Sequence, residues 1–219
     1  MTNRKLKKVI LEYLKDDDYL QSFEKILDFP PKKVINPLLS FFYNHDELIK
    51  WRSISATGQV VSKLANEGHL ESARVIMRRL MWNLNDESGG IGWGSPEAMG
   101  DIIARHDILA AEFHKILISY LMPDGNFLEH EMLQRGLLWG IGRLSNSRPE
   151  LFRTSSHLLL PFFQSKDPSH RGHAAWAAKP FQDILNPHKQ TLMEDNEKFL
   201  FYNNYQLNLV SISQIIAGF

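Results

Sequence analysis

The sequence predicts a mainly α-helical protein, built as a solenoid of stacked two-helix repeats and followed by a short β-hairpin and a helix. The main observation is a column of small residues that recurs every 42 positions and then after 36, at residues 56–58, 98–100, 140–142 and 176–178. Aliphatic residues follow the first three members, at Val60, Ile102 and Leu144. Two helices per unit of about 40 residues are the signature of α-solenoids.

Composition narrows the class of protein. The 219 residues include 25 Lys+Arg and 25 Asp+Glu, so the net charge is zero, which argues against a dedicated nucleic-acid binder. The chain has no cysteine, which excludes disulfides, iron–sulfur clusters, thiolate zinc sites and cysteine nucleophiles. Neither a signal peptide nor an apolar run of about 20 residues is present, so we expect a cytoplasmic protein without a membrane segment.

Helical spacing of apolar residues predicts a series of helices along the chain. Ser95 should be the N-cap of the helix that follows the glycine-rich segment, with Pro96 as its first residue. The expected helices cover residues 6–14, 20–27, 33–43, 47–65, 70–84, 95–105, 108–120, 129–144, 149–164 and 170–185.

The C-terminal stretch differs in kind. Residues 198–210 alternate around Asn203 and Asn204, which tolerate left-handed backbone, and this pattern predicts a β-hairpin. Ser211 and Gln214 then form a capping box that opens a short helix. An isolated hairpin is marginally stable in water, so we expect it to dock on the last helices and cover the apolar end of the solenoid. The predicted division is a repeat domain at 1–190 and a hairpin with its capping helix at 191–219.

Two stretches carry a family pattern: a proline in the first helix, an aspartate at the turn and an arginine early in the second helix. They are Pro37…Asp46…Arg52…Ala56 and Pro161…Asp167…Arg171…Ala175. This pattern resembles the HEAT repeat, and the resemblance implies an Asp–Arg ladder between repeats, interrupted where Gly94 and Gly136 replace the arginine. The segments NDESGGIGWGSPEAMGD and LQRGLLWGIGRL also resemble uncharacterised HEAT-like proteins of sulfate-reducing and related anaerobic bacteria, over residues 36–176.

The glycine-rich segment 85–94 interrupts the helical pattern and is the first candidate site. It lacks the Gly-Lys-Ser/Thr ending of a phosphate loop, follows a helix rather than a strand, and carries acids that repel phosphate. We therefore predict no nucleotide and no other cofactor. Asp86, Glu87 and Glu97 could supply acid–base chemistry or bind a hard cation, but we favour structural roles as a loop cap and a helix-dipole partner.

This segment should be ordered, because Trp82, Ile91 and Trp93 each offer large apolar area for burial. We expect Ile91 and Trp93 to fold onto the region of Trp139 in the next repeat. Asn85 or Asp86 would hold the turn by bonds to the backbone. The remaining acids, Glu87 and Glu97, would lie at the rim and be available to a partner.

Other catalytic and metal motifs are incomplete. His170 and His173 could share a helix face, but a zinc site needs three or four converging ligands, and neither HExxH nor EF-hand spacing occurs. No serine lies in a G-x-S-x-G context. We predict no metal site, and core packing for the five tryptophans, Trp51, Trp82, Trp93, Trp139 and Trp176.

The 42-residue shift also aligns acids of one repeat with arginines of the next. It relates Asp101 to Arg143, and we expect these two side chains to form an ion pair. The concave surface that these side chains would line is either a solvated surface with salt bridges or a groove, walled by tryptophans, that binds a protein or peptide. The predicted binding residues are Trp82, Asn85, Asp86, Glu87, Trp93, Glu97, Asp101, Gln134, Arg135, Trp139 and Arg143.

These observations favour a non-catalytic scaffold that binds a protein or peptide through its concave face and the 85–97 loop. The alternative is an enzyme similar to the HEAT-like lyases or DNA-glycosylases, which would use the loop carboxylates together with the groove arginines.

Overall fold

The computed structural model describes residues 2–85 and 92–218, and within these residues it contains twelve α-helices, a few short 3₁₀ segments and one two-stranded sheet. The predicted α-solenoid with a C-terminal hairpin and helix is confirmed. No helix in the described part of the chain is both long and apolar enough to cross a lipid bilayer.

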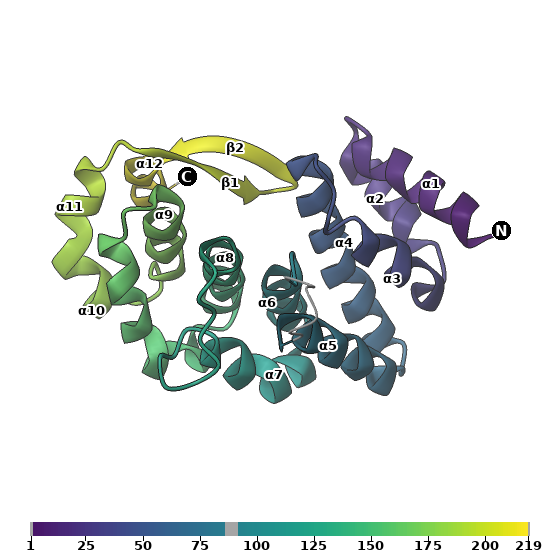
Figure 1. Ribbon diagram of the computed structural model, residues 1–219, viewed down its shortest axis with the longest axis horizontal. Coiled ribbons are helices and arrows are strands. Elements are labelled where there is room, and N and C mark those ends of the chain that lie inside the picture. The colour runs from purple at the N-terminus through teal and green to yellow at the C-terminus, as the bar shows by residue number, and fades with distance from the viewer. Residues whose placement is uncertain (1, 86–91, 219) are drawn as a thin grey trace.

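The helices form two rows that curve around one side of the molecule (Figure 1). The inner row consists of α4 (Glu47–Asn66), α6 (Ser95–Arg105), α8 (Glu131–Ser147) and α9 (Pro168–Ala177). The outer row has α5 (Leu70–Asn85), α7 (Asp107–Ser119) and the 3₁₀ helix η2 (Arg153–Gln164). The N-terminal end is covered by α1 (Asn3–Lys15), α2 (Tyr19–Leu27) and α3 (Pro31–Ser40).

The column of small residues sets the spacing of the inner row. A Cβ added at Gly100 would lie 2.3 Å from the Cα of Gly140, so the backbones of α6 and α8 are in direct contact. A Cβ at Gly142 would meet the ring of Trp176 on α9 at 2.2 Å. The close contacts therefore join second helices of successive repeats, and not the two helices of one repeat.

Several helix ends differ from the prediction. Ser95 is the first residue of α6 rather than its N-cap; Gly94, with φ of 75°, is the cap, and none of the described residues hydrogen-bonds to the buried Ser95 hydroxyl. The helix expected at 149–164 is η1 (Pro149–Leu151) followed by η2. The helix expected at 170–185 divides into α9 and α10 (Gln182–Leu185), because Pro180 disfavours helical backbone in the residue before it. A short 3₁₀ turn, η3 (Asn186–His188), and α11 (Lys189–Glu194) follow.

The arginines of the HEAT-like pattern bind groups other than the predicted aspartates. Arg52 Nη1 donates to the carbonyl oxygens of Leu14 at 2.9 Å and Asp16 at 2.8 Å. Arg171 pairs with Asp195 and Glu197, which precede the hairpin. These arginines therefore tie the two ends of the chain to the solenoid instead of linking neighbouring repeats.

The hairpin consists of β1 (Lys198–Asn203) and β2 (Gln206–Ser211), paired antiparallel. Its two left-handed residues are Asn204 (φ 48°) and Tyr205 (φ 61°), one position later than predicted. The capping box of Ser211 and Gln214 is confirmed at the start of α12 (Ile212–Ala217).

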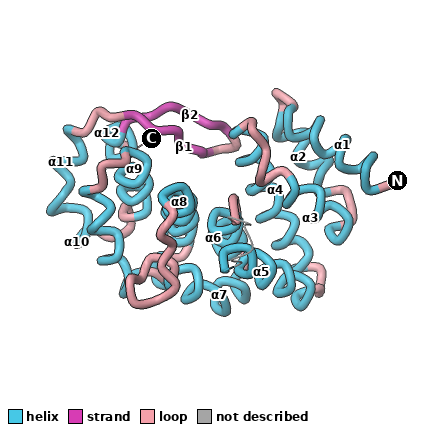
Figure 2. Tube along the Cα trace, in the orientation of Figure 1, coloured by secondary structure: helices cyan, strands magenta, loops and turns pink. Residues whose placement is uncertain are grey.

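The hairpin does not cap the end of the solenoid. It starts beside α9 and runs across the inner row to α4 (Figures 1 and 2). Phe199 packs at Gly172 of α9, where a Cβ would meet its ring at 2.1 Å. At the tip, the Tyr205 ring packs on Tyr19 of α2, and its carbonyl oxygen accepts from Arg52 Nε at 3.3 Å. The predicted docking on the last helices is confirmed by the contact with α9, but the hairpin also extends to the first helices, because aromatic surface there continues the contact.

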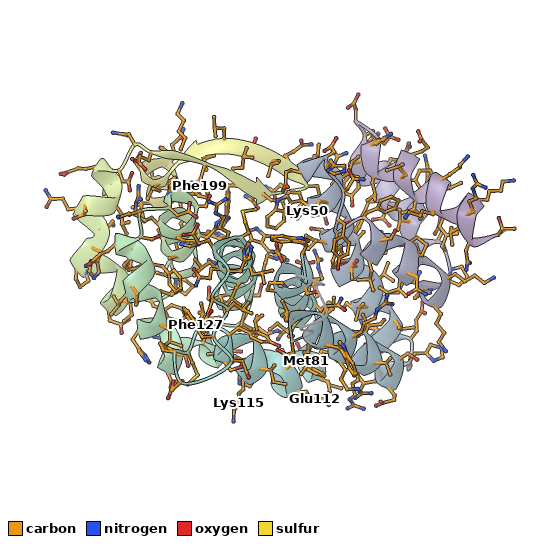
Figure 3. The ribbon with its side chains drawn as sticks, viewed as in Figure 1. Lys50, Met81, Glu112, Lys115, Phe127 and Phe199 are labelled. Carbon is orange, nitrogen blue, oxygen red and sulfur yellow. The ribbon has the colours of Figure 1, made fainter. Side chains whose placement is uncertain are left out.

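This arrangement gives the molecule two different sides. Figure 3 shows Lys50 and Phe199 on the side that carries the hairpin, and Glu112 and Lys115 on the opposite side, along the outer row. The outer side carries exposed ion pairs, for example between Arg74 and Glu112, whereas the hairpin side encloses cavities.

Candidate functional site

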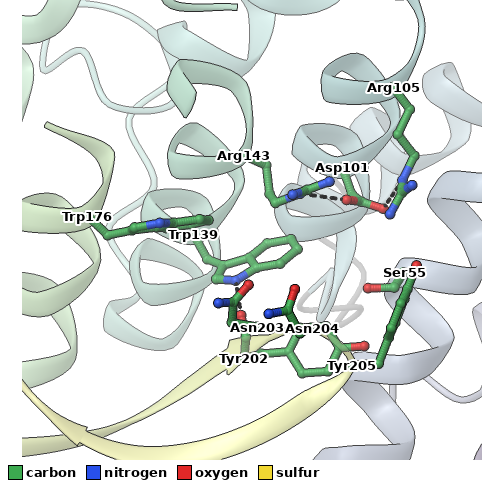
Figure 4. A pocket seen from close by; sticks show the side chains of 10 residues that line it. All are labelled: Ser55, Asp101, Arg105, Trp139, Arg143, Trp176, Tyr202, Asn203, Asn204 and Tyr205. Carbon is green, nitrogen blue, oxygen red and sulfur yellow. Dashed lines mark hydrogen bonds and ion pairs between the residues drawn. The ribbon is translucent and has the colours of Figure 1, made fainter. Parts of the chain in front are cut away.

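The first cavity, here called the hairpin cavity, lies between the hairpin tip and the inner row (Figure 4). Its volume is about 230 Å³, and Asp101, Arg105, Arg143, Trp139 and residues 202–205 line most of it. Helices α6 and α8 supply the charged groups, and the hairpin supplies the roof.

Asp101 organises the charges of this cavity. Its side chain is 1% exposed and accepts from Arg143 Nε at 2.7 Å and from Arg105 Nε at 2.8 Å, one arginine on each carboxylate oxygen. The predicted Asp101–Arg143 ion pair is confirmed. Burial by itself would lower the pKa of Arg105, but the charge and hydrogen bond of Asp101 outweigh it and raise that pKa above its usual value. Two guanidinium charges against one carboxylate leave the cavity with an excess positive charge.

An aromatic wall bounds the hairpin cavity. Trp139 Nε1 donates to the carbonyl oxygen of Tyr202 at 2.9 Å. The ring of Tyr202 stacks on Trp51, with centroids 5.2 Å apart, and Trp51 meets Trp139 edge-on at 4.9 Å. Burial raises the pKa of the Tyr202 hydroxyl above its usual value. The hairpin is thus attached to the repeats by rings and by one buried indole hydrogen bond.

A second cavity, here called the glutamate cavity, also has a volume of about 230 Å³. Trp51 lines it, whereas its ring partners Trp139 and Tyr202 line the hairpin cavity, so the aromatic wall lies between the two. Its polar lining consists of Glu47, Lys50, Glu97, Arg135, Ser169 and His173.

Glu97 is the buried acid of this second cavity. Its side chain lies against Gly136 of α8, where a Cβ would be 2.3 Å from Oε1, so a larger residue there would displace the carboxyl group. The residue is 5% exposed, and Oε2 has no hydrogen-bond partner in the described part of the chain. Burial raises the pKa of Glu97 to about 7, although the charge of Lys50 acts to lower it. The expected place at an open rim is therefore wrong, because Glu97 faces inward between α6 and α8.

Three of the residues predicted around the glycine-rich segment, Trp82, Asn85 and Trp93, line neither cavity. Trp82 is 72% exposed on α5, so its predicted core packing is wrong, and Asn85 is also exposed. Trp93 packs edge-on against His130 at 5.2 Å, at the start of α8, rather than against Trp139. Residues 86–91, including Asp86, Glu87 and Ile91, lie outside the described residues, and so does most of the loop whose order was predicted.

Two further predicted residues have structural partners. Gln134 Nε2 donates to the carbonyl oxygen of Leu128 at 2.7 Å and fixes the turn before α8. Arg135 pairs with Asp167, the N-cap of α9, and lines the glutamate cavity rather than the hairpin cavity. The predicted set is thus split, with Asp101, Trp139 and Arg143 in one cavity and Glu97 and Arg135 in the other.

Sequence reasoning missed several lining residues. Arg105 follows Asp101 by four positions, so helical spacing could have found it. The roof residues Asn203, Asn204 and Tyr205 gave no such signal, because they reach the site through a contact between the two ends of the chain.

Comparison with known proteins agrees with this architecture. An engineered protein of known structure is similar over 99% of this chain and 94% of its own, with a TM-score of 0.51 and 13% identity. A designed armadillo repeat protein, solved in complex with the peptide (KR)4, is similar over 97% of this chain and 96% of its own, also with a TM-score of 0.51 and 13% identity. The chain has an armadillo-like α-solenoid fold. At these identities the similarity concerns the fold alone.

Comparison of the sequence with known proteins does not assign the chain to a family. No protein-family model matches the chain. An uncharacterized protein of the archaeon Archaeoglobus fulgidus is 23% identical over 181 residues, which cover 82% of this chain and 92% of that protein. The resemblance to bacterial HEAT-like proteins stays a prediction.

Proposed function

We propose that this protein is a non-catalytic binding module of the repeat type, which holds an acidic side chain of a partner protein or peptide in the hairpin cavity. The observation that carries the proposal is the pair of guanidinium groups on Asp101. Each arginine gives its Nε–H to the aspartate, which orients both planes, and the two positive charges exceed the single negative one.

The size of the cavity supports a side chain rather than a cofactor. Pockets for drug-sized ligands span about 300–1,000 Å³, and the hairpin cavity has about 230 Å³. Arginine forks bind carboxylates with geometric specificity, and the aromatic wall supplies apolar contact for a methylene stem. The similar designed armadillo protein was solved with a basic peptide, so the charge preference proposed here is opposite to that of the bound peptide.

The geometry favours binding over catalysis at this cavity. A general base must lie within hydrogen-bond reach of the substrate. Asp101 is 1% exposed and each of its oxygens accepts from an arginine, so this carboxylate acts as a holder of the guanidinium groups.

The test uses three acetylated and amidated pentapeptides with glutamate, glutamine or lysine at the centre and glycine elsewhere. Binding is followed by tryptophan fluorescence, because Trp139 and Trp176 line the cavity. We expect the glutamate peptide to bind most tightly, and Arg143→Gln to weaken it at least tenfold. Arg4→Gln, an exposed arginine on α1, is the matched control. Equal affinity for all three peptides, or binding that survives Arg143→Gln, would contradict the proposal.

A further inference from the structure

The glutamate cavity holds two buried polar atoms, Glu97 Oε2 and His173 Nε2, that have no hydrogen-bond partner among residues 2–85 and 92–218. The two residues are 5% and 3% exposed, respectively, and they come from α6 and α9, helices that both face the cavity. A buried polar atom without a hydrogen bond destabilises the folded state, so two such atoms at one cavity indicate a place for a ligand that supplies donors.

The hydrogen bond of His173 defines what its free nitrogen can do. Nδ1 lies 2.8 Å from the carbonyl oxygen of Ser169, which can only accept, so Nδ1 carries the proton. In the neutral ring Nε2 is then an acceptor with an open lone pair. Burial keeps the ring neutral by lowering its pKa to about 4.

The other charged groups around the cavity are already paired. On α4, Lys50 Nζ lies 3.4 Å from Glu47. On α8, Arg135 pairs with Asp167 of the α9 N-terminus. Among the described residues, Glu97 is thus the charged group of the lining that has no ion-pair partner, and its charge determines which ligand the cavity accepts.

We propose that the glutamate cavity binds a primary ammonium group, which donates to Glu97 Oε2 and His173 Nε2 while its alkyl stem packs on Trp51. An ammonium group carries three donors and no acceptor, which complements two open acceptors. The face of an indole ring attracts cations and packs against methylene groups, and the cavity volume of about 230 Å³ suits a short alkylamine or a lysine side chain. This site is separate from the hairpin cavity and does not depend on the function proposed there.

The proposal predicts that affinity rises with pH. The cation binds the ionised carboxylate, and burial raises the pKa of Glu97 to about 7. The ionised fraction of such a group increases about tenfold between pH 6 and pH 8, and the apparent affinity follows the fraction of competent protein. Lys50 lowers and Glu47 raises the pKa of Glu97, and the other titratable or charged groups of the lining are Arg135 and His173.

The test is a titration of the intact protein with n-butylammonium chloride and, separately, with sodium butyrate, at constant ionic strength. The Trp51 indole resonance in ¹H–¹⁵N NMR spectra reports binding. We expect saturable shifts with butylammonium, with an affinity about tenfold higher at pH 8 than at pH 6. Glu97→Gln, which keeps the shape of the side chain, should reduce the affinity at pH 8 at least tenfold and abolish the pH dependence.

Controls make each outcome decisive. Glu12→Gln changes an exposed carboxylate on α1 and should leave the titration unchanged. If Glu97→Gln folds poorly, His173→Gln and the pH dependence of the unaltered protein still test the site. Binding of butyrate that weakens as pH rises would overturn the proposal in favour of an anion held by Lys50 and Arg135. The absence of binding by butylammonium up to 50 millimolar, on the order of the weakest specific sites, would also overturn it.

Discussion

The contact between Gly100 and Gly140 allows a quantitative test of the repeat architecture by a single methyl group. In Gly100→Ala the new Cβ would lie 2.3, 2.5 and 2.6 Å from the Cα, O and C atoms of Gly140. Carbon atoms in contact are normally about 3.5–4.0 Å apart, and all three atoms belong to backbone. Helices α6 and α8 must therefore separate by more than about 1 Å.

The expected cost follows from two opposing effects. Overpacking of a close-packed core costs about 1–3 kcal/mol, and we expect the upper end because no flexible side chain can yield. Replacing glycine by alanine in a helix stabilises the helix by up to about 1 kcal/mol, which opposes this cost. The net destabilisation should be about 2 kcal/mol, which for a chain of this size lowers Tm by about 4–8 °C.

Thermal unfolding followed by circular dichroism measures this effect. Val75→Ala is the control for helix propensity, since Val75 is 54% exposed on α5, and it should change the free energy of unfolding by less than about 0.5 kcal/mol. A Gly100→Ala variant as stable as the unaltered protein, or more stable, would refute the close approach of α6 and α8.

Three further substitutions test the hairpin and the buried ionisable groups. Arg52→Leu removes hydrogen bonds to three carbonyl oxygens, so amide exchange at the hairpin tip should accelerate at least tenfold; unchanged protection would contradict this anchoring. Trp139→Phe leaves the carbonyl oxygen of Tyr202 without its indole donor and should destabilise the protein by about 1–3 kcal/mol, measured by urea unfolding. The pKa of Glu97 is raised from 4.5 to about 7, so the native state binds the proton more tightly. The stability advantage of the unaltered protein over Glu97→Gln should therefore fall by about 3 kcal/mol between pH 4.5 and 7 and then stay level; a difference independent of pH would contradict this. The pKa of His173 is lowered from 6.5 to about 4, so His173 contributes stability that increases with pH between 4 and 6.5 and partly masks the effect of Glu97 in the unaltered protein.

The inner row could be predicted from the sequence because its cause is local and periodic. Each small residue of the column lies at the same place in its repeat, and the same shift of 42 positions brings Asp101 to Arg143. Register along a solenoid is conserved from one repeat to the next, so alignment in sequence becomes proximity in space.

The hairpin cavity could be predicted only in part, because its roof depends on contacts between the two ends of the chain. Alternation showed that β1 and β2 would pair, but nothing in the periodicity indicated that Tyr205 would reach Arg52 on the first repeats. The burial of Glu97 was missed for a related reason. An acid in a first helical turn is usually solvated, and only Gly136 on another helix makes room for it.

The hairpin also changes the mechanics of the solenoid. An open array of repeats can change its curvature, because each repeat contacts only its neighbours and the two ends are free to move apart. Here Arg52 on α4 and Arg171 on α9 hold the C-terminal segment near the two ends of the inner row. The segment therefore connects the ends of the curved array and restrains its curvature. Opening the curve requires the hairpin tip to leave α4. A partner that binds by stretching the solenoid must therefore work against the hairpin, and repeats that could otherwise melt one by one are coupled into one cooperative unit.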